Sequence, residues 1–345
     1  MEISKLRTGE EDAWDSYVYE SDASTFYHQI GWRNVVLKTY GHKPRYLVAR
    51  GADGGIVGVL PMFLMESRVF GRKLVSVPFA PYGGVCADDA EVGRALVEEG
   101  ERVARGDGVD YFEIRGLSDD GRYGGGLVTN DAYFTLVTKL EQDPELVWQR
   151  FSRKVRNATR KAMKAGLEVV TAAEYLRDFY RIFARNMRDL GAPVHAYSFY
   201  ANLQGEFPKQ TGIAVVRCDG QVIAGIFLLY FRDTVISGWA SSDRSYQRFN
   251  PNNLLYWEVI KDGCEAGYDY FDFGRSIADS GTYRFKKPWG AEVARLCYQY
   301  YLNKAKKMPD TSQISPKRKM FAKVWRRMPV SLAERVGPRL RGSFP

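Results

Sequence analysis

An internal repeat constrains this chain most, because a pattern present twice requires one module to form twice. Residues 45–64 contain two apolar runs separated by a turn at Asp53-Gly54-Gly55. Residues 212–231 have the same form around Asp219-Gly220, 166 residues after Asp53-Gly54. Apolar runs joined by an Asp-Gly turn are typical of an antiparallel hairpin. The sequence therefore predicts a hairpin in each half of the chain.

The elements after each hairpin also repeat. A further strand follows (74–85 and 234–243), then a helix (90–105 and 253–266), then a β-rich strand (109–116 and 268–276). Within the last pair, the sequence DYFE at Asp110 matches DYFD at Asp269 with an offset of 159 residues. Residues 134–140 are expected to close the first module and residues 295–302 the second. This order predicts a mixed α/β (α+β) fold of two tandem modules similar to the GNAT acetyltransferase fold.

The chain has 345 residues, enough for two domains. We expect an N-terminal domain over residues 1–145, a C-terminal domain over 146–302 and a tail over 303–345. The four cysteines form no C-x-x-C pair, residues 1–17 contain no apolar core of signal-peptide length, and no apolar stretch in the chain approaches the length of a spanning helix. These features predict a reduced, cytoplasmic protein.

Positive charge is concentrated in two segments. Residues 303–345 contain twelve Lys and Arg and two acids, a net charge of +10. Since the whole chain has a net charge of +9, residues 1–302 together are near −1. Residues 150–164 contain seven more Lys and Arg and no acid. The spacing of Val147, Phe151, Val155, Ala158 and Ala162 predicts one helix over residues 147–165 with an apolar stripe and a basic remainder. That basic surface, which includes Arg156, is either a solvated face or a phosphate-binding face.

Several reaction classes lack their motifs. The chain has three histidines, no G-x-S-x-G elbow and no cysteine in an activating context. It has no clustered His and carboxylate pattern, no G-x-G-x-x-G and no P-loop. The sequence therefore predicts no metal site and no bound cofactor, and it favours chemistry by positioning and electrostatics.

Three segments are candidates for such a site. In residues 77–85, prolines and the Tyr82-Gly83-Gly84 turn interrupt a strand and form either a substrate wall or a β-bulge. Residues 273–290 form a Gly- and Ser-containing loop with cations and aromatic rings, which suits an anionic or nucleotide-bearing substrate, although a plain basic loop is the alternative. The side chains that we expect to contact substrate there are Arg275, Tyr283 and Trp289. His195, which lies among aromatic residues, is expected to be a buried structural histidine.

A series of segments, taken in chain order, resembles the FemAB family over nearly the whole chain. The resemblance rests on HQIGWRNVVLKTYGHKPRYLVAR, SVPFAPYGGV, KVRNATRKAMKAGL, MRDLGAPV, FDFGRS, GTYRFKKPWG and YQYYL. The nearest subgroup is similar to proteins associated with the PEP-CTERM/exosortase system. Membership implies two tandem GNAT-like domains. In the characterised branch it implies transfer of an amino acid from aminoacyl-tRNA to an amine of a peptidoglycan precursor, with a Phe-Lys pair near the transferred group.

The matching pair here is Phe285-Lys286, although the coiled-coil arm of some members is absent between Val169 and Tyr230. We expect Lys286 to be the cation that stabilises developing negative charge or holds a donor phosphate. Asp272 is a possible general base or a solvent-facing strand residue. The expected activity is that of an acyl- or aminoacyltransferase acting on a cell-envelope or exopolysaccharide-related acceptor, such as a lipid-linked saccharide or peptide.

Two alternatives remain at this point. An N-acyltransferase could use acyl-CoA or an acyl-carrier protein as the donor, although the usual Q/R-x-x-G-x-G/A pyrophosphate loop is not evident. A non-catalytic pseudo-transferase could bind a carbohydrate or lipid-linked precursor.

The tail from Pro316 places Met320, Phe321, Val324, Trp325 and Met328 on one helical face among Lys and Arg. This pattern is typical of a helix lying on an anionic membrane, here the inner membrane face. A nucleic-acid arm and a solvated extension are the alternatives.

Overall fold

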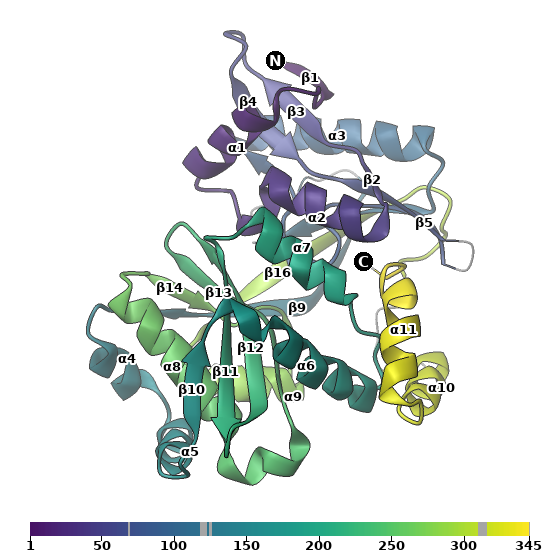
Figure 1. Cartoon of the computed structure of the whole chain (residues 1–345). Coiled ribbons are helices and arrows are strands. Elements are labelled where there is room, and N and C mark those ends of the chain that lie inside the picture. Colours follow the sequence, from purple (N-terminus) through teal and green to yellow (C-terminus); the bar gives the residue numbers. More distant parts are fainter. Residues whose placement is uncertain (68–69, 118–122, 124–125, 310–315, 345) are drawn as a thin grey trace. The chain divides into compact units, whose positions relative to one another are not determined.

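The structure is a computed structural model that describes the chain except for residues 68–69, 118–122, 124–125, 310–315 and 345 (Figure 1). The chain divides into two units. Unit 1 comprises residues 1–133, 295–311 and 342–345, and unit 2 comprises residues 134–294 and 312–341. Each unit is described by itself below.

Unit 1 is built from short strands and three α-helices among its described residues. Its elements are β1 (Glu2–Lys5), α1 (Glu11–Glu20), η1 (Phe26–His28), α2 (Ile30–Tyr40), β2 (Lys43–Pro44), β3 (Leu47–Arg50), β4 (Ile56–Leu60), β5 (Phe63–Ser67), β6 (Gly71–Val75), β7 (Cys86–Ala87), α3 (Ala90–Gly106) and β8 (Tyr111–Gly116), with parts of β9 (Val128–Lys139) and β16 (Glu292–Leu302). Helix α3 connects the parallel strands β6 and β8. Its Asp89 caps the first turn by accepting from the amides of Glu91 and Val92.

The predicted hairpin of unit 1 forms, but its second apolar run is divided. Strand β4 pairs with β3 and β7, whereas β5 pairs with β6 and β2 in a different sheet. Pro61 lies between β4 and β5. Because proline has no N–H to donate to a neighbouring strand, the apolar run breaks there into two strands.

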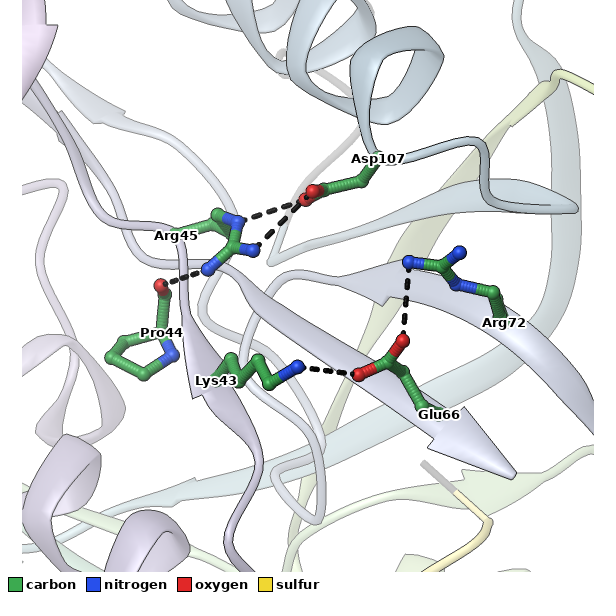
Figure 2. Close-up of polar contacts among 6 residues, drawn as sticks. All are labelled: Lys43, Pro44, Arg45, Glu66, Arg72 and Asp107. Atoms are coloured by element: carbon green, nitrogen blue, oxygen red, sulfur yellow. Dashed lines mark hydrogen bonds and ion pairs between the residues drawn. The ribbon is translucent and has the colours of Figure 1, made fainter. Parts of the chain in front are cut away.

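Polar contacts join β2, β5, β6 and the end of α3 in unit 1 (Figure 2). The Arg45 guanidinium donates to both carboxylate oxygens of Asp107, at 2.8 and 3.3 Å, and to the carbonyl of Pro44 at 3.1 Å. Glu66 pairs with Lys43 at 2.9 Å and with Arg72 at 3.1 Å. The bidentate, half-buried Arg45–Asp107 pair is the stronger interaction, because exposed lysine pairs contribute little.

Unit 2 contains a sheet in the order β10-β11-β12-β13-β14-β9. Its elements, besides its part of β9 and β16, are α4 (Pro144–Arg150), α5 (Arg153–Met163), β10 (Glu168–Thr171), η3 (Ala173–Tyr175), α6 (Leu176–Leu190), α7 (Tyr197–Glu206), β11 (Thr211–Cys218), β12 (Gln221–Phe231), β13 (Thr234–Ser242), η4 (Arg244–Phe249), α8 (Pro251–Glu265), β14 (Tyr270–Asp272), β15 (Ser276–Ile277), α9 (Gly281–Lys286), η5 (Lys287–Trp289), α10 (Pro316–Trp325) and α11 (Val330–Arg341).

Strand alternation places helices on both faces of this sheet. Ile226 of β12 belongs to the core cluster that includes Leu255 of α8, whereas the neighbouring Phe227 packs its ring against Phe179 of α6. Successive residues of a strand point to opposite faces, so α8 and α6 cover opposite sides. The tight turn of the β11–β12 hairpin is confirmed at Asp219-Gly220, where both residues have positive φ, 49° and 77°.

Four expectations about the elements were wrong. The strand expected over residues 74–85 ends at Val75 with β6, and residues 76–85, which include Pro78 and Pro81, form no strand. The single helix expected over residues 147–165 is two helices, because Phe151 is extended and Ser152 starts α5 by accepting from the amide of Val155. The closing strands are exchanged: residues 297–302 of β16 pair with β8 in unit 1, and residues 137–139 of β9 pair with β14 in unit 2. Trp325, expected on the outer face of the tail, is buried.

The tail packs as two helices on α6 within unit 2. Arg188 donates to the carbonyl of Met328 at 2.9 Å, and a Cβ added to Gly191 would lie 2.6 Å from that of Ala322. This close approach requires glycine at the end of α6, where φ is +81°.

Candidate active site

The candidate site of unit 2 lies where two parallel strands separate. Strand β14 pairs with β13 only over Tyr270–Asp272 opposite Thr234–Ile236, whereas β13 continues to Ser242. Gly274 follows with φ +73°, and a Cβ there would lie 3.2 Å from the carbonyl oxygen of Ser237. Glycine is therefore required for the chain to turn away from β13 at this distance.

Asp272 shapes this turn. Its Oδ1 accepts from the hydroxyl of Thr135 at 2.5 Å and from the amide of Gly274 at 2.7 Å. The carboxylate is buried, so the expectation of a solvent-facing strand residue is wrong. These contacts hold the backbone that faces Lys286, and the role of Asp272 as a general base stays a prediction.

Lys286 is the last residue of α9, a short helix that Ser280 caps by accepting from the amide of Tyr283. Its side chain is buried and its Nζ donates to the carbonyls of Gly274 at 2.9 Å and Arg275 at 3.2 Å. An ammonium has three N–H donors, and contacts within the described residues use two of them. One donor is left for a ligand atom.

Burial lowers the pKa of Lys286 to about 8; the charge of Asp272 opposes this shift and that of Arg275 adds to it. At neutral pH the group is therefore mainly an ammonium. A buried cation at the divergence of two strands can stabilise an oxyanion or a phosphate. Residues 281–286, expected as part of a loop, form the short helix α9, and Lys286 at its end is buried.

Aromatic rings pack together beside Lys286, around the preceding residue Phe285. Phe285 is half-buried and packs on the rings of Tyr256 and Trp289, at 5.3 and 5.9 Å between centroids. Trp289 is fully buried in the core cluster, so its ring faces the core and not a substrate. Tyr256 was not singled out from the sequence; its hydroxyl lies 3.0 Å from the hydroxyl of Ser237.

The other residues expected in the loop are more accessible. Arg275 is exposed, and Tyr283 is half-buried with the Lys287 ammonium 5.7 Å from its ring centroid. Arg156 lies on α5, whose first turn contacts η5 through a hydrogen bond from the Ser152 amide to the Pro288 carbonyl, 2.9 Å. The start of the basic helix thus lies beside the segment that follows Lys286.

In unit 1, the position that corresponds to Gly274 carries a charged side chain. At the repeat offset of 159 residues, Arg115 corresponds to Gly274. Arg115 is buried, with its Nε 2.8 Å from Glu113 and a further donor 2.8 Å from the carbonyl of Ala80. Although burial opposes it, the charge of Glu113 holds the pKa of Arg115 above its ordinary value. The cation here is used for structure.

The Tyr82-Gly83-Gly84 turn of unit 1 is engaged internally. The Gly83 amide donates to the Arg115 carbonyl at 3.1 Å, and the Gly84 carbonyl lies 3.1 Å from Nε2 of His28. Tyr82 is buried beside Tyr27. The backbone before the turn is strained, because Val77 has φ +51° and a β-branched residue rarely adopts this region. The predicted contact of this turn with substrate stays a prediction.

His195 is buried, as expected, and burial lowers its pKa well below the ordinary value. No group of three or more His, Cys, Asp and Glu in the described residues has a metal-binding arrangement.

Residues 149–287 match the family model of the acetyltransferase (GNAT) domain. Among curated proteins, none is significantly similar in sequence. The crystal structure of FemX is similar with a TM-score of 0.72 and 16% identity, covering 88% of this chain and 98% of that chain.

Two further solved structures are similar. The C-terminal domain of a putative lysylphosphatidylglycerol synthetase from Agrobacterium fabrum has a TM-score of 0.59 and 12% identity, covering 84% of this chain and 91% of its own. A tandem GNAT protein from the clavulanic acid biosynthesis pathway has a TM-score of 0.56 and 12% identity, covering 87% and 98%. At these identities the likeness concerns the fold. The predicted fold class, mixed α/β with GNAT-like modules in tandem, is confirmed.

Proposed function

We propose that this protein transfers an aminoacyl or acyl group to an amine, and that Lys286 in unit 2 stabilises the transition state. The observation that carries the proposal is the buried ammonium with one donor left, at the point where β13 and β14 separate. The GNAT domain over residues 149–287 includes this lysine. The similar folds of FemX and of a putative lysylphosphatidylglycerol synthetase favour an aminoacyl donor.

The chemistry follows from the geometry. The neutral amine of the acceptor attacks the carbonyl carbon of the donor ester, a C–N bond forms, and the carbonyl oxygen becomes an oxyanion. The remaining N–H of Lys286 donates to this oxygen. The tetrahedral intermediate then collapses, the C–O bond to the leaving ribose breaks, and the proton from the attacking nitrogen leaves on the ribose oxygen. Exposed Arg275 and the nearby basic helix α5, including Arg156, would hold donor phosphates, with Phe285 and Tyr283 beside them.

The acceptor in this proposal is an amine on a cell-envelope or exopolysaccharide-related molecule, reached at the inner face of the membrane. The assignment to the PEP-CTERM-associated subgroup belongs to the same proposal. An acyl-CoA or acyl-carrier donor is the second candidate, which the GNAT family match favours; there a C–S bond breaks and a thiol leaves.

The test compares wild-type protein with Lys286→Met. Each is incubated with an envelope-precursor extract and either a mixture of labelled aminoacyl-tRNAs or acetyl-CoA, and new amides are identified by mass spectrometry. Loss of a cation that stabilises an oxyanion typically reduces the rate by about 10²–10³-fold, so we expect this reduction for Lys286→Met. Lys287→Met is the matched control, because Lys287 is the adjacent lysine and is exposed, with its ammonium 5.7 Å from the ring centroid of Tyr283.

The outcomes separate the candidates. Label transferred from tRNA supports the aminoacyl donor, and thiol release with acetylated product supports the CoA donor. Equal rates for wild type and Lys286→Met would remove Lys286 from the chemistry. No transfer from either donor, with a precursor retained by the purified protein, would identify a non-catalytic binding protein.

A further inference from the structure

The tail helices expose an apolar surface on unit 2 that the transfer reaction does not use. Met320, Val324 and Leu190 are 68%, 62% and 50% exposed, and Phe321 is also exposed. Leu190 ends α6, and its carbonyl accepts from Arg326 of the segment after α10 at 3.3 Å, so the two elements adjoin (Figure 1). We call these four residues the tail apolar patch.

Positive charge surrounds the patch. Lys319, Lys323, Arg326 and Arg327 are exposed in and just after α10. The sequence from Pro316 to Ala333 contains no Asp or Glu. The nearest acid on the supporting helix, Asp189, is paired with Arg188 at 2.6 Å. The field around the apolar side chains is therefore positive and is not neutralised by acids of α10 itself.

Buried contacts hold the patch from its inner side. Trp325 is buried, and its ring stacks on Phe321 at 5.3 Å between centroids. Further along, Gly337 of α11 approaches Val194, whose backbone nitrogen would lie 3.2 Å from an added Cβ. Trp325 thus anchors the helix to the protein and leaves Met320, Phe321 and Val324 facing outward.

We propose that the tail apolar patch docks unit 2 on an anionic phospholipid bilayer. Apolar side chains within a basic field match both parts of such a surface, since lipid phosphates attract the cations and the acyl boundary accepts the apolar groups. A nucleic acid would complement the charge but leave the exposed Met320 and Val324 without a function. No helix among the described residues has the length and apolar character to cross a membrane, so the contact is a surface contact.

The test is vesicle flotation of the full chain. Vesicles of phosphatidylcholine with about one third phosphatidylglycerol are compared with pure phosphatidylcholine, at low and high salt. We expect binding to the anionic vesicles only, weakened but not abolished by salt, because the apolar contribution is not screened. The triple variant Met320→Ser/Phe321→Ser/Val324→Ser should bind at least about tenfold more weakly. The variant Lys319→Gln/Lys323→Gln/Arg327→Gln should lose on the order of a hundredfold at low salt.

Matched controls remove equal numbers of exposed residues elsewhere. Leu37→Ser/Leu146→Ser/Val293→Ser controls for apolar loss and Arg94→Gln/Arg177→Gln/Lys209→Gln for charge, since all six residues are exposed outside the tail. Both controls should float like wild type. Unchanged thermal unfolding confirms that the triple variants remain folded.

Three results would overturn the proposal. One is no flotation with anionic vesicles at low salt. Another is single-stranded RNA binding with a steep salt dependence, together with vesicle binding that ignores the apolar triple variant, which would identify a nucleic-acid arm. The third is a dimer in sedimentation that the apolar triple variant dissociates while vesicles do not bind, which would make the patch an interface between two copies.

Discussion

At the scale of single residues, the protonation of Lys286 decides what its side chain can do. Burial lowers its pKa to about 8, so the ammonium persists at neutral pH but is lost under mildly alkaline conditions. An ammonium that stabilises an oxyanion is needed in its charged form. A lysine that acted as a base would instead be needed neutral. The pH dependence of the rate therefore distinguishes the two roles.

We predict that the ratio of the wild-type transfer rate to the Lys286→Arg rate, measured at saturating donor and acceptor, falls as the pH rises through about 8, because the ratio cancels the deprotonation of the acceptor amine, which affects both proteins equally. Lys286→Arg should be slower at neutral pH, because a guanidinium does not reproduce the two carbonyl contacts of the ammonium, but its rate should not fall through this range, since arginine stays charged. A wild-type rate that increases continuously above pH 8, in parallel with Lys286→Arg, would contradict the cationic role.

At the scale of elements, the turn after β14 supports the site through one glycine. Gly274 has a positive φ, donates to Asp272 and presents its carbonyl to Lys286. Gly220, in the β11–β12 hairpin, has a similar φ of +77° but nothing within 4 Å of an added Cβ. Alanine variants of Gly220 and Gly274 therefore separate the cost of backbone strain from the cost of close packing.

We predict that Gly220→Ala costs about 1–2 kcal/mol of unfolding free energy from strain alone. Gly274→Ala should cost at least about 1 kcal/mol more, because its Cβ would press on the carbonyl of Ser237. It should also slow transfer, whereas Gly220→Ala should not. Denaturant unfolding and single-turnover rates measure both effects. Equal stability and equal rates for the two variants would show that Gly274 does not shape the site.

At the scale of the whole molecule, each unit is completed by a strand that the sequence order assigned to the other module. Strand β8 of unit 1 pairs with Cys297–Leu302, not with the segment that follows it by sequence. Tyr298 and Tyr300 of that partner strand are buried. A fragment ending after residue 140 therefore lacks the strand that covers the edge of β8.

We predict that residues 1–140 alone show no cooperative thermal transition by circular dichroism, because β8 would expose its ladder and apolar side chains. Attaching residues 292–309 through a flexible linker should restore cooperative unfolding. A sharp transition in the unlinked fragment would show that the first module is closed by its own residues, as the sequence order predicted.

Much of the fold was predictable from local sequence. The Asp219-Gly220 turn, the helix that begins after Asp89 and the repeated strand at Asp110 and Asp269 all depend on backbone preferences and apolar periodicity over a few residues. Lys286 was expected as the cation from a family resemblance, and the structure gives it two carbonyl partners. The sequence patterns do not point to Thr135 or Gly274 as part of the site. The glycine after Asp272-Phe273 is nevertheless a usable signal for a turn at the end of a strand.

The sequence by itself determined the periodicity, the turns and the two-fold repetition, because these depend on neighbours along the chain. It did not determine which closing strand pairs with which sheet. Residues 134–140 and 295–302 both have strand patterns, and pairing between distant strands is decided by competition among long-range contacts. The same holds for burial: Trp289 and Trp325 have the aromatic character of a binding surface, yet packing against Phe285 and Phe321 placed them inside. Only the tertiary structure decides such cases, because one side chain suits a core or a surface equally well until its neighbours are in place.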